Sequence, residues 1–146
     1  MDKVRNSGIN GMLVNLFNHV MEVESNAVIT EEFKDITNND MHIIEAVGVN
    51  KPRKMSDIAK LLGVTVGTLT TNMNGLEKKS YIIRERSLKD KRVVFITLTE
   101  RGKKAFFHHR DFHKNMIKAV VADLDDTEKR VLYKALEKLN KFVEQL

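Results

Sequence analysis

The sequence has no cysteine and a single proline, Pro52, among its 146 residues. Without cysteine, disulfide bonds, thiolate ligands for zinc and thiol-based oxidant sensing are excluded. No apolar run approaches the roughly 20 residues of a membrane-spanning helix, and residues 1–5 lack the apolar stretch of a signal peptide. We therefore expect a soluble cytoplasmic protein. With one proline and seven glycines, few helix breaks are available, so long helices should dominate.

Signatures of enzyme active sites are also missing. The sequence has no cysteine nucleophile, no glycine-rich phosphate loop and no serine elbow. Its acidic residues are scattered among basic neighbours, which is typical of a solvated surface rather than of paired catalytic carboxylates. We expect no enzymatic activity.

The positive charge is concentrated in one segment. From Lys51 to Arg92, eleven Lys and Arg side chains stand against four Asp and Glu, a local balance of +7. The other residues carry fourteen basic and sixteen acidic side chains, so the formal net charge of +5 comes entirely from this segment. Such an asymmetry is typical of a surface that binds a polyanion.

Hydrophobic periodicity and capping residues predict six helices. They are expected at about residues 9–25, 37–48, 56–63, 65–79, 99–122 and 125–146. The predicted N-caps are Thr37, Ser56, Thr65, Thr99 and Asp125, and the predicted helix ends include Gly48 and Gly63. Residues 82–86 and 93–98 are rich in β-branched and aromatic types and flank the polar turn 87–92, which predicts a β-hairpin.

A helix-turn-helix followed by a basic hairpin is the layout of a winged helix-turn-helix DNA reader. We therefore expect a mainly α fold with a small β-hairpin wing. The whole chain, 1–146, is predicted to be a single domain. Residues 38–98 would form its DNA-binding part, and residues 1–37 plus 99–146 its helical dimerisation part.

The predicted helix at 65–79 has two different faces. One face carries apolar residues that should pack inward: Val66, Leu69, Met73 and Leu76. The other carries small polar residues, which suit a major groove because Thr can meet a thymine methyl and Asn can bond adenine. The contacts predicted from this helix are Thr65, Gly67, Thr68, Thr70, Thr71, Asn74 and Lys78. The alternative is a solvated helix with no ligand.

The hairpin would bring charge to DNA phosphates and to the minor groove. The residues predicted to do so are Arg84, Arg86, Lys89, Asp90, Lys91 and Arg92. Asp90 belongs to this set because an acid beside DNA is repelled unless it orients a guanidinium, here that of Arg92. A solvated charge run explains any one of these residues but explains the cluster poorly.

The last predicted helix carries an apolar seam. Its members recur in steps of four and three: Leu132, Leu136, Leu139, Val143 and Leu146. Burial within the same chain is one explanation. Dimerisation is favoured, because a two-fold dimer reads two half-sites about 34 to 36 Å apart, which gives a specificity that one reading head lacks.

These features resemble the MarR-type winged-helix transcriptional regulators. The matching stretches are 58–64 (IAKLLGV), 65–71 (TVGTLTT), 76–82 (LEKKSYI), 90–92 (DKR) and 98–102 (LTERG). Within that family, residues 67–71, 86–87, 90–94 and 112–116 are most similar to repressors of bacterial fatty-acid synthesis genes. The resemblance implies a homodimeric repressor of an AT-rich pseudopalindromic operator, with long-chain acyl groups on acyl carrier protein as co-repressor and no cofactor.

Two positions depart from the family pattern. Thr71 stands where many members have Arg, and without that bidentate guanine reader the site should require fewer G·C pairs. Ser80 stands where Gly usually follows the fourth helix. Left-handed geometry costs a non-glycine residue about 1 kcal/mol, so we expect this helix to end differently.

The family's effector cavity lies where the helices approach the winged part. The residues that the resemblance places there are Met12, Leu16, Met41, Ile44, Phe106, His109 and His113. Flexible thioethers suit a pocket for chains of several lengths, although most such side chains are ordinarily core.

Two alternatives remain open at this point. His109 and His113 lie one helical turn apart and could share zinc, as in zinc-sensing relatives, with Glu31, Glu32 or His42 completing the site. Exposed or hydrogen-bonded imidazoles are the more ordinary outcome, and we predict no metal site. The chain could also respond to another small ligand, or use the winged fold for interactions that do not read sequence.

Overall fold

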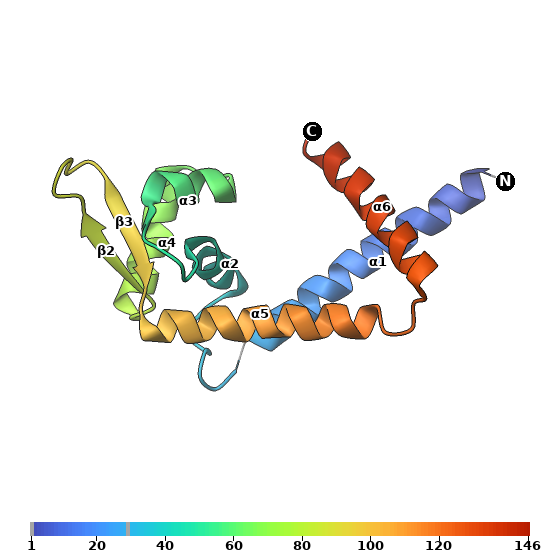
Figure 1. Ribbon diagram of the computed structural model, residues 1–146, viewed down its shortest axis with the longest axis horizontal. Helices are drawn as coiled ribbons and strands as arrows, with labels where there is room; N and C mark the ends of the chain where they lie inside the picture. Colours follow the sequence, from blue (N-terminus) through green and yellow to red (C-terminus); the bar gives the residue numbers. More distant parts are fainter. Residues whose placement is uncertain (1, 29) are drawn as a thin grey trace. The chain divides into compact units, whose positions relative to one another are not determined.

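The computed structural model describes the backbone of residues 2–28 and 30–146 and the side chains of residues 8–28 and 30–146. These residues form six helices and a three-stranded antiparallel sheet (Figure 1). The helices are α1 (Asp2–Val28), α2 (Asn38–Val47), α3 (Met55–Leu62), α4 (Val66–Lys78), α5 (Glu100–Val120) and α6 (Asp126–Val143). The strands are β1 (Arg53–Lys54), β2 (Ile82–Arg86) and β3 (Val94–Leu98). The mainly α fold with a small winged sheet is confirmed.

The chain divides into two compact units, residues 1–110 and 111–146. In the first unit, α2, α3, α4 and the sheet enclose one hydrophobic core. Its fully buried side chains include Met41, Ile44, Ile58, Leu69, Met73, Leu76, Tyr81 and Ile96. The predicted inward face of α4 is correct except at Val66, which is 47% exposed because it lies in the first turn of the helix.

Most predicted helix caps are present. The Thr37 hydroxyl accepts from the Asp40 N–H while the Asp40 carboxylate accepts from the Thr37 N–H, a complete capping box. A second box joins Asp125 and Glu128 at the start of α6. Thr65 caps α4 by accepting from the Thr68 N–H, and Thr99 caps α5 by accepting from the Gly102 N–H. Gly48 and Gly63 end α2 and α3.

The predicted cap at Ser56 is wrong. The helix α3 already begins at Met55, and its N-cap, Lys54, makes no side-chain capping bond. The reason is long-range: Arg53 and Lys54 pair with Ile96 and Phe95 of β3, so the chain turns from a strand directly into the helix. The wing is therefore part of a sheet of order β1-β3-β2 rather than a hairpin alone.

The expectation that Ser80 would change the end of α4 is also wrong. Ser80 takes the left-handed conformation, with φ of 66°, that a glycine would take. The N–H of Ser80 donates to Glu77 O at 3.0 Å, and the N–H of Tyr81 donates to Leu76 O at 2.9 Å. The Thr99 hydroxyl donates to Ser80 O at 2.6 Å. These bonds offset the cost of about 1 kcal/mol for a non-glycine residue there.

The second unit contains α6, in which no residue is buried. Three of its apolar side chains, Leu136, Leu139 and Val143, are 44 to 63% exposed. In the first unit, α1 likewise exposes apolar side chains, including Met12 and Phe17. Among the described residues, no helix is both long enough and apolar enough to cross a membrane.

Candidate nucleic-acid interface

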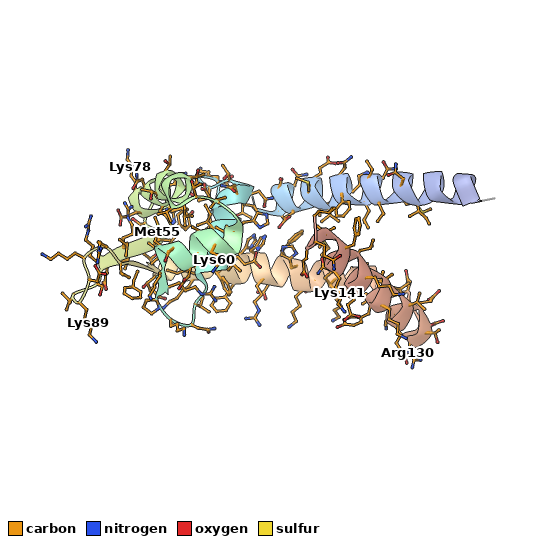
Figure 2. The ribbon with its side chains drawn as sticks, turned by 90° about the horizontal axis from the view of Figure 1, so that it is seen from above. Met55, Lys60, Lys78, Lys89, Arg130 and Lys141 are labelled. Carbon is orange, nitrogen blue, oxygen red and sulfur yellow. The ribbon has the colours of Figure 1, made fainter. Side chains whose placement is uncertain are left out.

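The outer face of α4 presents short polar side chains. Thr68, Asn74 and Lys78 are exposed, and Figure 2 shows Lys78 pointing outward from the helix. The Thr70 hydroxyl donates to Val66 O at 2.7 Å, one turn back along α4. Because the hydroxyl proton is already donated to a hydrogen bond within the helix, Thr70 can offer an external partner only its methyl group and the lone pairs of its oxygen.

The tip of the wing is ordered by its own hydrogen bonds. The Ser87 hydroxyl oxygen accepts from the N–H groups of Lys89 and Asp90 at 3.2 and 3.3 Å. The N–H of Ser87 donates to Val93 O at 2.9 Å, which closes the loop. Lys89 lies at the end of the hairpin (Figure 2). A loop held in this way presents its charges from a defined position.

Asp90 binds Arg92, as predicted from the sequence. Its Oδ1 atom accepts from Arg92 Nε at 3.2 Å and from the Arg92 N–H at 3.0 Å. The Arg92 side chain is nevertheless 93% exposed. The carboxylate therefore orients the guanidinium without shielding it from an approaching anion.

Arg84 differs from Arg86 and Arg92, whose guanidinium groups bond within the hairpin, to Lys91 O and Asp90, because its guanidinium is bound to side chains of α4. It donates to the carboxylate of Glu77 at 2.9 and 3.3 Å and to Asn74 Oδ1 at 2.6 Å. The hydrogen bond with Glu77 raises the pKa of Arg84 and lowers the pKa of Glu77. Sequence reasoning missed Glu77 because its partner is on another element and no local spacing connects them.

A basic groove of about 620 Å³ lies between α3, α4 and the sheet. It is lined by Lys54, Met55, Ser56, Val66, Thr70, Arg84, Arg86, Arg92, Val93 and Val94. The predicted contact residues Thr70, Arg86 and Arg92 thus come together. Lys54 joins them because β1, which the sequence did not predict, places it beside β3.

The residues predicted for the effector pocket are in different environments. Met41 and Ile44 are fully buried core residues, and Phe106 packs partly buried against the core. Met12 and Leu16 lie on the exposed face of α1. His113 belongs to the second unit. A single pocket made by these residues stays a prediction.

His109 is buried and lies among acids that sequence reasoning missed. Its Nε2 is 2.9 Å from Glu24 Oε1 and its Nδ1 is 3.6 Å from Glu45 Oε2. His42 lies 3.8 and 3.9 Å from the same two carboxylates. Glu45 could have been found, because it stands three residues after His42 on α2. Glu24 gives no such signal, since it comes from α1.

The acids proposed from the sequence to accompany the histidines are paired elsewhere. Glu31 is 3.6 Å from Lys34, and Glu32 is 3.9 Å from Lys104. Both carboxylates are largely exposed. The acidic neighbours of His109 are therefore Glu24 and Glu45 instead.

Comparison with known proteins places this arrangement in a family. Residues 27–109 match the model of the transcriptional regulators SarA/Rot. The uncharacterized HTH-type transcriptional regulator YpoP of Bacillus subtilis is 30% identical over 78 residues, which is 53% of this chain and only 55% of the length of YpoP.

Two solved structures with DNA are also similar. Streptococcus pneumoniae FabT in complex with DNA is 37% identical, with a TM-score of 0.91 over 96% of this chain and 98% of that one. The complex of Staphylococcus aureus MepR with DNA is 26% identical, with a TM-score of 0.71 over 90% of this chain and 96% of that one. The chain belongs to the SarA/Rot family of transcriptional regulators and has the winged-helix fold of MarR-type regulators; it is a DNA-binding transcriptional regulator rather than an enzyme.

Proposed function

We propose that the protein is a cytoplasmic, homodimeric repressor of fatty-acid synthesis genes that binds an AT-rich pseudopalindrome. Long-chain acyl groups on acyl carrier protein would be its co-repressor. The observation that carries this proposal is the similarity to FabT, which extends over nearly the full length of both chains. The resemblance of residues 67–71 and 90–94 to repressors of fatty-acid synthesis genes supports the same subgroup.

In this proposal α4 enters the major groove and the wing reaches the phosphates and the minor groove. Thr68, Thr70 and Asn74 would face base edges. The charges of the wing would come from Arg86, Lys89, Lys91 and Arg92. The absence of Arg at position 71 favours a site with few G·C requirements.

The dimer is supported by exposed apolar faces. The face of α6 that carries Leu132, Leu136, Leu139 and Val143 buries no residue in the described chain. Contiguous apolar surface of this kind is unusual on a monomer and is typical of a subunit interface. A two-fold dimer would present two copies of α4 to successive major grooves.

The co-repressor would act by favouring one separation of the two reading helices. A ligand with equal affinity for all separations would regulate nothing. Binding of the purified protein to the promoters of fatty-acid synthesis genes tests this, with unacylated and long-chain acylated acyl carrier protein as the paired additions. We expect tighter binding with the acylated form only. Promoter binding that is unchanged by every acyl species would contradict the co-repressor.

A second candidate, regulation by zinc, is favoured by the buried pair of His109 and Glu24, whose Nε2 and Oε1 atoms lie 2.9 Å apart. His113 follows His109 by one turn on α5, which places a second imidazole on the same side of that helix. Imidazole and carboxylate groups are ligands that zinc accepts.

Calorimetric titration of the protein with zinc alone separates this candidate from the first. If zinc regulates the protein, His113→Ala should abolish tight binding and His19→Ala, at an exposed histidine of α1, should leave it intact. Equal zinc affinity of the two variants would remove His109 and His113 as a regulatory site. No effect of zinc on promoter binding would leave the acyl co-repressor as the only candidate.

A further inference from the structure

Arg84 connects the sheet to the reading helix. Its Nε and Nη2 donate to the two carboxylate oxygens of Glu77, and Nη2 also donates to Asn74 Oδ1 at 2.6 Å. Glu77 and Asn74 are three residues apart on α4, so they are neighbours on one side of that helix. The Arg84 side chain is only 25% exposed. One cation on β2 thus holds an acid and an amide on α4.

This contact determines which way the Asn74 amide points. A guanidinium has only hydrogen-bond donors, so the atom of Asn74 that faces it must be the carbonyl oxygen. The amide nitrogen of Asn74 is therefore the end directed away from Arg84. The orientation of the Asn74 amide therefore follows from its hydrogen bond. It does not require the amide oxygen and nitrogen, which have nearly the same size, to be told apart in any other way.

The orientation matters because an asparagine that reads adenine uses both ends of its amide. The oxygen accepts from adenine N6 while the nitrogen donates to N7. The bond from Arg84 takes one of the two lone pairs of Oδ1 and turns this oxygen toward the guanidinium, so the end of Asn74 that faces outward is the amide nitrogen with its two N–H donors. Such a donor matches an acceptor edge of the major groove: guanine N7 or O6, adenine N7, or thymine O4.

Glu77 keeps Arg84 in this position. Two hydrogen bonds to one carboxylate define the plane of the guanidinium as well as its place. Arg92 is also paired with a carboxylate, that of Asp90, but its side chain is 93% exposed whereas that of Arg84 is 25% exposed, so Arg84 is less available to a phosphate. Arg84 and Arg92 are both basic residues of the wing, but the structure gives them different surroundings.

We propose that Arg84, anchored by Glu77, is a positioning residue that presents the Asn74 amide nitrogen as a hydrogen-bond donor to one base of the operator. Arg84 itself makes no phosphate contact. The inference rests on the proposed function, because it requires α4 to lie in the major groove. It adds which residue sets the donor pattern of the reading helix and which edge of a base that pattern selects.

The variant Asn74→Asp tests the proposal directly. It keeps an oxygen toward Arg84 and replaces the outward NH₂ donor by an acceptor of the same size. The control is Asn72→Asp, which adds the same charge on the same helix but about 200° around its axis from Asn74. Affinity is measured against a set of operators in which one base pair is changed at a time.

Relative to Asn72→Asp, we expect Asn74→Asp to lose at least about 10-fold on the preferred operator. The change in preference should be confined to one base-pair position in each half-site. There the variant should favour a base with an exocyclic amino donor, cytosine or adenine. Identical preferences of the two variants at every position would overturn the proposal.

Arg84→Met gives an independent measurement. This variant keeps the apolar part of the side chain and removes its hydrogen-bond donors. The base preference at the position read by Asn74 should therefore weaken, while the salt dependence of operator affinity should stay that of the wild type. A salt slope shallower by about 1, with all base preferences unchanged, would instead identify a phosphate contact and overturn the proposal. A wild-type protein without any preference would overturn the proposed function as well, whereas a selective wild type matched by Asn74→Asp would overturn only this inference.

Discussion

The Tyr81 hydroxyl donates a 2.6 Å hydrogen bond to Asp35 Oδ1, joining the segment before α2 to the turn between α4 and β2. Arg101 of α5 completes the junction. Its guanidinium lies 4.3 Å from the centre of the Tyr81 ring, pairs with Asp35 at 3.2 Å and donates to Lys79 O at 2.7 Å. Three elements are thereby fixed beside the C-terminal end of the reading helix.

Removing the Tyr81 hydroxyl should weaken the fold in a pH-dependent way. Burial raises the pKa of Asp35, but the hydrogen bond from Tyr81 and the charge of Arg101 outweigh it, so the pKa lies below its ordinary value of 3.8. A lowered pKa stabilises the fold above the unfolded-state pKa, and this contribution is lost as pH falls through the folded-state pKa. We expect Tyr81→Phe to cost about 1 kcal/mol of unfolding free energy at pH 7.

Urea unfolding at pH 7 and at acid pH checks this. The difference in unfolding free energy between the wild type and Tyr81→Phe should shrink as the pH falls below 3.8, because the Asp35 carboxylate then becomes protonated in both proteins. Tyr133→Phe is the control, because Tyr133 is 70% exposed on α6 and should change stability little at either pH. A difference that is the same at both pH values would contradict the role of Asp35.

Gly102 should tolerate no side chain. A Cβ atom there would overlap Tyr81 O and lie 3.2 Å from Leu98 Cβ, so α5 could not keep its place against the turn. We expect Gly102→Ala to destabilise the fold by about 1 to 3 kcal/mol in thermal unfolding. Gly75→Ala is the matched control in α4, where a Cβ meets nothing within 4 Å and a gain of up to about 1 kcal/mol is expected. Equal effects would show that the close packing is not a constraint.

Arg92 should contribute one phosphate contact. Its alanine variant is expected to weaken operator binding and to make the slope of log affinity against log salt shallower by about 1. Arg130→Ala serves as the control, because this arginine lies on α6, where its Nε donates to Asp126 O at 3.2 Å. Fluorescence anisotropy at several salt concentrations gives both slopes. A slope unchanged by Arg92→Ala would remove Arg92 from the interface.

A charge on the apolar face of α6 should dissociate the dimer. Leu136 is 55% exposed in the single chain, and a carboxylate at its position would be buried without a partner in a subunit interface. We expect Leu136→Glu to be monomeric in sedimentation equilibrium and to bind the operator at least about 100-fold more weakly. Lys134→Glu, on the polar side of the same helix, should remain dimeric. A dimeric Leu136→Glu protein would place the interface elsewhere.

Much of the fold could be predicted because its signals are local. The capping oxygens of Thr37, Thr65 and Asp125 each accept from the N–H three residues ahead, so their sequence pattern is sufficient. Ser56 fits the same pattern, but α3 already begins at Met55, because Lys54 before it is paired with β3. Ser80 was expected to alter the end of α4, and bonds from other elements hold it in place instead.

The candidate site was predictable in its location and less so in its chemistry. The charge of residues 51–92 and the small polar face of α4 indicate where DNA would bind. The attachment of Arg84 to Glu77 and Asn74 depends on how β2 lies against α4, which no periodicity encodes. For the same reason Glu24, from a distant helix, could not be identified as the partner of His109.

If α4 and the basic wing together read a specific duplex, the protein must discriminate between duplexes of the same base composition. Its affinity for a site selected from random DNA is compared with its affinity for a scrambled version of that site at about 0.15 M salt. We expect a preference of at least about 1,000-fold for the selected site. Equal affinity for the two duplexes would show that α4 and the wing do not read sequence.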